Sequence, residues 1–113
     1  MTYTLNGNKY SLSDPEVTIS TGTLQMYGRK GELTENIMMS NYQEGSHTVP
    51  VTGAILVDVD NTEAGIYSCN QGAIVVNSLS QTHISGTFSG TVFSEINRSP
   101  VPITGTFDVD IPK

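Results

Sequence analysis

Two histidines and one cysteine are the side chains of this chain best suited to catalysis at neutral pH. A nucleophilic site would need the Cys69 thiol or a serine hydroxyl beside a histidine base, with a third group orienting that base. The Gly-x-Ser-x-Gly motif is absent. His47 follows a predicted turn and His83 precedes a predicted strand, so we expect both at the surface, at strand ends. We therefore predict no catalytic residues and a protein that is not an enzyme.

Cys69 is the single cysteine, so it cannot form an intrachain disulfide or contribute to a cluster of zinc-binding thiolates. We interpret it as a small, buried, apolar residue. A reactive thiol is the alternative.

The densest acidic cluster lies where a predicted strand enters a polar loop, and it includes Asp58, Asp60 and Glu63. Calcium prefers carboxylate and amide oxygens of this kind, although the spacing of an EF-hand is absent. These three residues are the candidate calcium ligands, and a solvated loop is the alternative reading. No other metal and no cofactor is predicted.

Tyrosines are the candidate ligand-binding residues, because an exposed ring can stack on a sugar. The candidates are Tyr27, Tyr42 and Tyr67, which could equally straddle core and solvent. Asp108 and Asp110 share one face of a predicted strand, as the carboxylates of a glycosidase can. Without a second acidic pair nearby, we interpret them as solubilising charges.

The elements that must position these residues are strands. The phrase Ile-[Ser/Thr]-Gly-Thr-Phe occurs at Ile84–Phe88 and again at Ile103–Phe107, and each copy opens a run of alternating residues. The segment Glu95–Pro100 between them is rich in turn-forming residues. The pattern predicts an antiparallel hairpin.

Alternate side chains of a strand point to opposite faces, so each run of this hairpin has one apolar face. Pairing the apolar faces predicts three opposed couples, which are Phe88–Phe107, Ile84–Ile111 and Val92–Ile103. We expect Gly86 and Gly90 to flank the rings or to mark a bend. The other face carries hydroxyls and is predicted to be wet, with the couples Thr91–Thr104, Ser89–Thr106 and Thr87–Asp108.

The rest of the chain also indicates short strands with turn signals every eight to twelve residues. Further predicted strands are Tyr3–Leu5, Lys9–Leu12, Val17–Ser20, Leu24–Gly28, a long strand Val49–Val59, Ile66–Cys69 and Ala73–Val76. The last two are expected to form a hairpin around Asn70-Gln71-Gly72, and Glu44-Gly45-Ser46 and Ser13-Asp14-Pro15 are expected to interrupt strands. Leu33–Tyr42 has partial helical spacing but is predicted as a strand.

The composition bounds the protein class. The 113 residues predict one domain, residues 1–113, an all-β antiparallel sandwich or flattened barrel of about eight to ten strands. Five basic residues and a net charge of −6 exclude the basic patch needed for nucleic acid or anionic lipid. No apolar run reaches the length of a membrane span, and no secretion signal is recognised at Met1-Thr2-Tyr3.

The closing pattern Ile84–Phe88 and Ile103–Val109 resembles the C-terminal hairpin of small lipoprotein-like domains of unknown function from Bacteroidetes. The strand Thr23–Gly28, the turn at Gly45 and the step Gly65-Ile66-Tyr67 are similar as well. The resemblance implies an antiparallel sandwich, export to the bacterial cell envelope or outer surface, and a lipid anchor upstream of Met1. It supplies no catalytic residues.

Together these observations predict a non-catalytic β-sandwich module with an interaction or structural role. Its partner would be an unidentified protein or glycan, and a glycan-binding module is the second hypothesis. A hydrolase fragment is the third hypothesis, and it would need a histidine beside a nucleophile.

Overall fold

The computed structural model describes residues 1–20, 22–30, 33–40, 42–49, 53–58, 66–94 and 100–111. Every regular element in these ranges is a β-strand, which confirms the all-β class. The ten strands are β1 (Thr2–Leu5), β2 (Asn8–Ser11), β3 (Ser13–Ser20), β4 (Thr23–Lys30), β5 (Leu33–Ser40), β6 (Gly45–Val49), β7 (Gly53–Asp58), β8 (Ile66–Leu79), β9 (His83–Ser94) and β10 (Pro100–Asp110).

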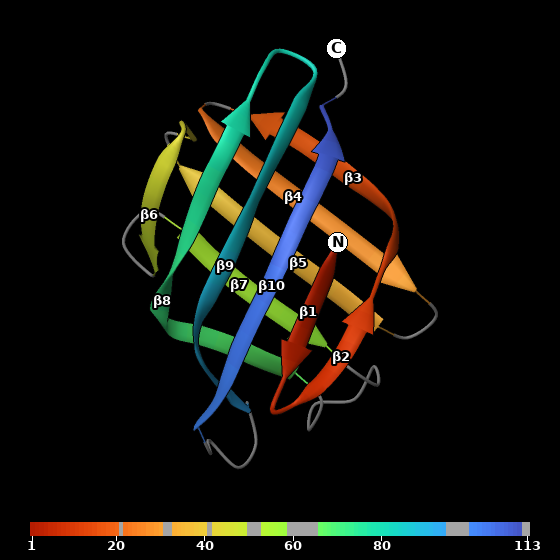
Figure 1. The fold of residues 1–113 in the computed structure, drawn as a ribbon, viewed down its shortest axis with the longest axis vertical. Helices are drawn as coiled ribbons and strands as arrows, with labels where there is room; N and C mark the ends of the chain where they lie inside the picture. Colours follow the sequence, from red (N-terminus) through yellow and green to blue (C-terminus); the bar gives the residue numbers. More distant parts are fainter. Residues whose placement is uncertain are drawn as a thin grey trace.

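All ten strands belong to one antiparallel sheet with the order β2-β1-β10-β9-β8-β7-β5-β4-β3. Strand β6 lies off this path and pairs with β8. The sheet folds back on itself, so that β8, β9, β10, β1 and β2 cross in front of β3, β4, β5 and β7 (Figure 1). The result is a half-barrel with two layers, consistent with the predicted sandwich or flattened barrel.

The corner between the two layers is made by β8. Its first residues, Ile66–Ser68, pair with β7, and Gly72–Val76 pair with β6, while its other edge follows β9. The pairing with β9 shifts register between Cys69 and Gln71. The predicted hairpin at Asn70-Gln71-Gly72 is therefore wrong. The residues that suggested a turn form a bulge, which bends a single long strand.

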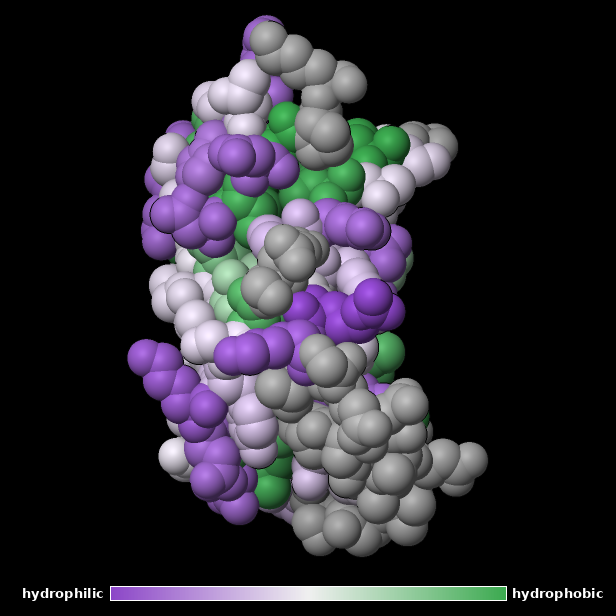
Figure 2. All heavy atoms as spheres, turned by 90° about the vertical axis from the view of Figure 1, so that its right-hand side faces the viewer, coloured by the Kyte–Doolittle hydropathy of each residue, from purple (hydrophilic) through white to green (hydrophobic). Residues whose placement is uncertain are grey.

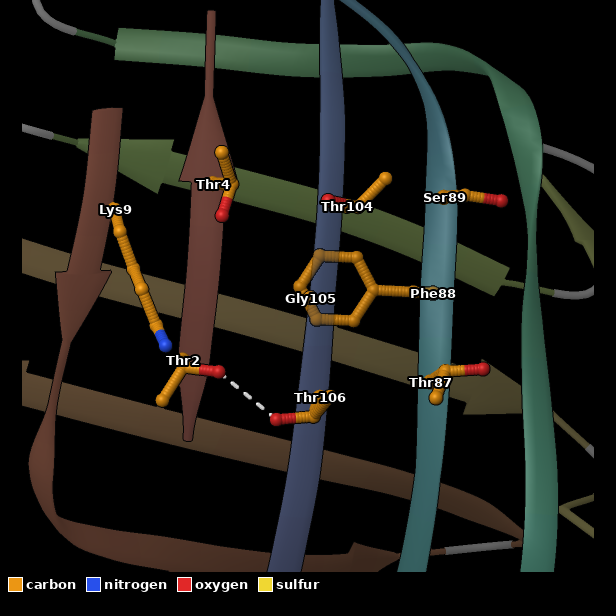
Figure 3. Close-up of a pocket in the computed structure, with 9 residues that line it drawn as sticks. All are labelled: Thr2, Thr4, Lys9, Thr87, Phe88, Ser89, Thr104, Gly105 and Thr106. Atoms are coloured by element: carbon orange, nitrogen blue, oxygen red, sulfur yellow. Dashed lines mark hydrogen bonds between the residues drawn. The ribbon is translucent and has the colours of Figure 1, made fainter. Parts of the chain in front are cut away.

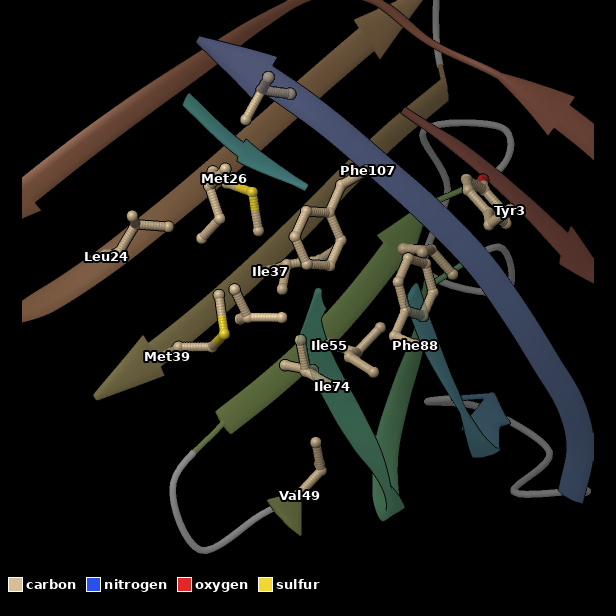
Figure 4. Close-up of a cluster of buried hydrophobic side chains, with 14 of the residues drawn as sticks. Tyr3, Leu24, Met26, Ile37, Met39, Val49, Ile55, Ile74, Phe88 and Phe107 are labelled. Atoms are coloured by element: carbon tan, nitrogen blue, oxygen red, sulfur yellow. The ribbon is translucent and has the colours of Figure 1, made fainter. Parts of the chain in front are cut away.

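The core lies between the layers and is filled from both sides (Figure 4). Ile37 and Met39 of β5 meet side chains from the front layer, such as Phe107, and all three are almost fully buried. Alternation explains the arrangement, because each strand sends every second side chain inward. The other large, fully buried side chains include Tyr3, Leu24, Met26, Ile55, Ile74, Ile84 and Ile103.

The last hairpin has the predicted faces but not the predicted register. Phe88 and Phe107 both point into the core, yet Phe88 is opposite Gly105 and Phe107 is opposite Gly86. The three predicted couples are therefore wrong by two residues, and so are the hydroxyl couples on the outer face. Side-chain volume favours the observed register, because each phenylalanine ring then packs over a glycine, which has no side chain. A Cβ placed on Gly86 would lie 2.7 Å from Phe107 Cζ.

Gly90 has the other predicted role and marks a bend. It lies opposite Gly72, next to the bulge in β8. A Cβ on Gly90 would lie 2.9 Å from the sulfur of Cys69. The thiol therefore fills space that this glycine pair leaves open, which is close to the packing role predicted for Cys69.

The predicted hairpin at the start of the chain is confirmed. Strands β1 and β2 are joined by a two-residue turn, with positive φ angles of 50° at Asn6 and 86° at Gly7. Asn-Gly favours this turn because both residues tolerate that region. Leu33–Ser40 is a strand, so the predicted strand is correct there and the helical alternative is wrong.

Three predicted boundaries need correction. The long strand Val49–Val59 is interrupted, since Val49 ends β6 and β7 spans Gly53–Asp58. Gly45 and Ser46 begin β6 and do not form the predicted turn. Ser13-Asp14-Pro15 lies inside β3, where the pairing with β4 shifts register between Ser13 and Glu16. In the last two cases, pairing with a neighbouring strand outweighs the local preference of turn-forming residues.

Candidate functional site

The outer face of the front layer carries a regular array of hydroxyl groups, which we call the threonine face. It consists of Thr2, Thr4, Thr87, Ser89, Thr104 and Thr106. These residues form two rows across β1, β10 and β9, because cross-strand partners share a face. One row is Thr2–Thr106–Thr87 and the other is Thr4–Thr104–Ser89.

A shallow depression of about 420 Å³ lies between these two rows (Figure 3). Its floor is formed at Phe88 and Gly105, where the strands lack an outward side chain. Lys9 of β2, which is opposite Thr4, stands at one side and supplies an ammonium group. The depression is thus open, bordered by hydroxyls and flanked by one cation.

The chemistry of this face is hydrogen bonding in both directions, because each hydroxyl can donate and accept. The Oγ1 atoms of Thr2 and Thr106 lie 2.8 Å apart and are hydrogen-bonded to each other. Strand geometry spaces the backbone positions that carry these hydroxyls about 4.8 Å apart between strands and about 7 Å apart along a strand. Such a grid fits a ligand that itself carries many hydroxyls.

His83 lies further along the same outer surface and is held between two carboxylates of β10. Its Nδ1 is 3.0 Å from Oδ1 of Asp110, and its Nε2 contacts Asp108. All three side chains are exposed, as predicted for the two aspartates. Because both ring nitrogens are engaged, neither is available as a general base.

The carboxylates should control the titration of this histidine. The hydrogen bond to Asp110 is the main cause that raises the pKa of His83 above its ordinary value of 6.5. We expect Asp110→Asn to lower that pKa in an NMR titration of the imidazole protons, because the amide cannot balance the imidazolium charge. The interaction stabilises the folded protein at low pH and is lost as the pH rises through the raised pKa.

Glu16→Gln is the matched control for this titration, since Glu16 lies on β3 and is not among the charged groups that raise the pKa of His83. It should leave the pKa of His83 unchanged. An identical His83 titration in the wild type and in Asp110→Asn would contradict the role of Asp110 in raising the pKa of His83.

His47 is not at the surface, so the prediction for this residue is wrong. It is 8% exposed and points inward from β6, as Val49 does. Its Nε2 donates a hydrogen bond to the carbonyl oxygen of Gln43, at 2.8 Å. The cause is the early start of β6 at Gly45, which brings His47 into the strand alternation.

Cys69 is half-buried, and its thiol donates to the carbonyl oxygen of Gln71 at 3.4 Å. Burial raises the pKa of the Cys69 thiol, which lowers the fraction of thiolate, the nucleophilic form.

The candidate calcium ligands are only partly described. Asp58 ends β7, whereas Asp60 and Glu63 lie outside the described residues. Among the residues that the structure describes, no group of three or more His, Cys, Asp or Glu side chains could hold a metal ion.

The three candidate tyrosines lie at three different places. Tyr27 is on β4 and faces outward from the back layer, next to Asn36. Tyr42 precedes β6 and lines an open end of the half-barrel beside Leu79. Tyr67 is the second residue of β8 and packs against the core. The structure therefore does not bring them together into one aromatic platform.

Glu35 is a notable residue that our sequence reasoning missed. It points into the core from β5 and is fully buried, and both carboxylate oxygens lack a hydrogen-bond partner among the described residues. The hydroxyl of Tyr3 is buried and unpartnered as well. Burial raises the pKa of Glu35 to about 8, and the N-terminal ammonium group opposes this rise. The signal was visible in the alternation, since Glu35 shares a strand face with Ile37 and Met39.

Comparison with models of known protein families, with curated proteins and with solved structures found no match. No helix among the described residues is long and apolar enough to cross a membrane.

Proposed function

We propose that this protein is a non-catalytic binding module that contacts a glycan through the threonine face. The observation that carries the proposal is the pair of cross-strand hydroxyl rows that border the depression over Phe88 and Gly105. A polyhydroxylated ligand can exchange hydrogen bonds with both rows at once. The ammonium of Lys9 can add a charge-assisted hydrogen bond to a sugar hydroxyl or carboxylate.

A non-catalytic role is supported by the state of the groups that could perform catalysis. Both nitrogens of His83 are engaged by carboxylates, and His47 is buried and bonded to a carbonyl. The raised pKa of Cys69 disfavours its thiolate. The two histidines and the Cys69 thiol are therefore in surroundings that do not activate them for catalysis.

We also propose that the protein acts at the bacterial cell envelope or outer surface, as an exported interaction or structural module. The resemblance of the two Gly-Thr-Phe strands to envelope lipoprotein-like domains supports this location. Fractionation of the native host tests it, since recovery in the cytosol alone would contradict it.

The glycan proposal is tested by comparing the wild type with Thr104→Val/Thr106→Val on a broad glycan array. Valine keeps the shape of threonine and removes the hydroxyl, so two central hydrogen-bonding groups of the depression are lost. We expect binding to at least one glycan class, weakened about thirtyfold in the variant, because two neutral hydrogen bonds are lost and each contributes about 1 kcal/mol.

Thr18→Val/Thr23→Val makes the same chemical change on the opposite layer and should bind as the wild type does. Silence of the wild type across the array would contradict the proposal. Equal binding by Thr104→Val/Thr106→Val would show that the threonine face is not the site.

A further inference from the structure

The half-barrel has an open seam between β3 and the end of β10. Strand β3 is the last strand of the sheet and pairs with β4 on one side only. On β10, pairing with β1 stops at Thr106, so Phe107–Asp110 continue beyond the end of β1. No strand of the described residues pairs with the outer edge of β3. A free strand edge exposes unpaired backbone donors and acceptors.

A groove follows this seam. Its first part, about 440 Å³, lies between Pro15–Thr18 of β3 and Asp110–Ile111 at the end of β10. Past Ile111 it continues into a second depression of about 510 Å³, which is lined by Ile19, Tyr42 and Leu79. Figure 2 views the molecule from the side of the seam and shows apolar surface exposed in its upper part.

The groove is apolar along its floor and acidic at its rim. Val17 and Ile111 are nearly buried in it, while Ile19 is 43% exposed, which is high for a large aliphatic side chain. Glu16 and Asp110, which also holds His83, line the first part, and none of the described residues that line either part is a lysine or arginine. Acidic side chains at the rim favour a basic occupant.

The same charges disfavour a second copy of this chain. Antiparallel pairing of two β3 edges would bring the acidic rims of two molecules together, each with a net charge of −6. Pro15 also limits the edge, because proline cannot donate to a ladder. The segment left for pairing is Glu16–Ser20, which is long enough for a short added strand.

We propose that this seam binds an extended cationic peptide, which adds as a further strand along the edge of β3. Its backbone pairs with Glu16–Ser20, its alternate apolar side chains enter the groove between Val17 and Ile111, and its basic side chains face Glu16 and Asp110. Strand addition of this kind derives affinity from main-chain hydrogen bonds and specificity from pockets for alternate side chains. The seam is a separate surface from the threonine face.

The test uses a capped nonapeptide in which lysine and valine alternate. We expect NMR titration of the intact protein to shift the amides of Glu16–Ser20, with binding weakened at least fivefold by Ile19→Asp. Ile19 is exposed, so this variant should remain folded, which the same spectra verify. A peptide of the same sequence with alternate N-methylated amides has lost backbone donors and should bind at least fivefold more weakly.

A peptide in which threonine replaces valine keeps the charge and tests the apolar contribution. Equal affinity for the valine, threonine and N-methylated peptides would reduce the interaction to charge and overturn the proposal. Absence of binding at millimolar peptide would overturn it too. Dimerisation of the free protein through Glu16–Ser20, abolished by Ile19→Asp, would make a second copy the occupant and would also overturn it.

Discussion

The free energy of unfolding is expected to fall by about 5 kcal/mol as the pH rises from about 4.5 to about 8, because the folded protein must keep Glu35 protonated. In this range the carboxyl group is protonated in the folded state and ionised in the unfolded state. The folded state therefore holds one more proton, and stability decreases with rising pH. Above about pH 8 the contribution levels off.

The physical cause is the burial of a carboxylate without partners. Both oxygens of Glu35 are buried and unpartnered among the described residues, and ionisation would place a charge in the core. Other ionisable groups around this end of the core are the Tyr3 hydroxyl, Tyr10, Asp58 and the N-terminal ammonium. Burial and the nearby Glu35 carboxyl raise the pKa of Tyr3, so Tyr3 remains neutral in this pH range.

Urea unfolding between pH 5 and pH 9 measures this effect in the wild type and in Glu35→Gln. Glutamine has the shape of the protonated acid at every pH, so the variant should match the wild type near pH 5 and exceed it by several kcal/mol near pH 9. Glu16→Gln, an exposed position, should retain the wild-type slope. Parallel pH profiles for the wild type and Glu35→Gln would contradict the assignment.

Gly105→Ala is expected to destabilise the protein by about 3 kcal/mol, because the added methyl group enters space that Phe88 already occupies. A Cβ at Gly105 would lie 2.6 Å from Cε1 of Phe88 and 2.5 Å from the carbonyl oxygen of Thr2. The added methyl group would therefore clash with both a side chain and the backbone. The strands cannot separate without breaking the pairing of β10 with β1 and β9.

A double-mutant cycle in chemical denaturation checks this cause. Phe88→Leu replaces the ring with a shorter side chain, so Gly105→Ala should destabilise the protein by at least 1 kcal/mol less in that background than in the wild type. Thr104→Ala, the neighbouring outward position, should cost less than 1 kcal/mol. If Gly105→Ala cost the same in both backgrounds, the ring would not be the reason for glycine at this position.

The faces of the strands could be predicted from the sequence, but their register could not. Alternation places Phe88 and Phe107 on one face, and a shift of two residues preserves that face. The choice between the two registers depends on volume across the pair, where a ring fits over glycine and two opposed rings do not. That three-dimensional fit is absent from a pattern of apolar and polar residues.

Long-range pairing also explains why the bend in β8 was missed. Asn70-Gln71-Gly72 has turn chemistry, and a local reading favours a hairpin. In the fold, β9 is long enough to pair with both halves, so these residues become a bulge in one strand. By contrast, the Asn6-Gly7 hairpin was predictable, because its two strands and turn are contiguous and need no distant partner.

The candidate site was predictable only in part. The hydroxyl face of β9 and β10 follows from alternation, whereas Thr2 and Thr4 join it only because β1 pairs with β10 across the length of the chain. Topology likewise separates Tyr27, Tyr42 and Tyr67, which sequence spacing cannot show. The buried Glu35 followed from alternation but was obscured by the helical spacing in its segment.

The measurement that tests the proposed function most directly is an NMR titration of the isotope-labelled protein with the glycan that gives the strongest array signal. We predict that amide shifts concentrate on β1, β9 and β10 around Thr104 and Thr106, and that they diminish in Thr104→Val/Thr106→Val. Shifts confined to the opposite layer around Tyr27, or to the seam along β3, would contradict a binding role for the threonine face.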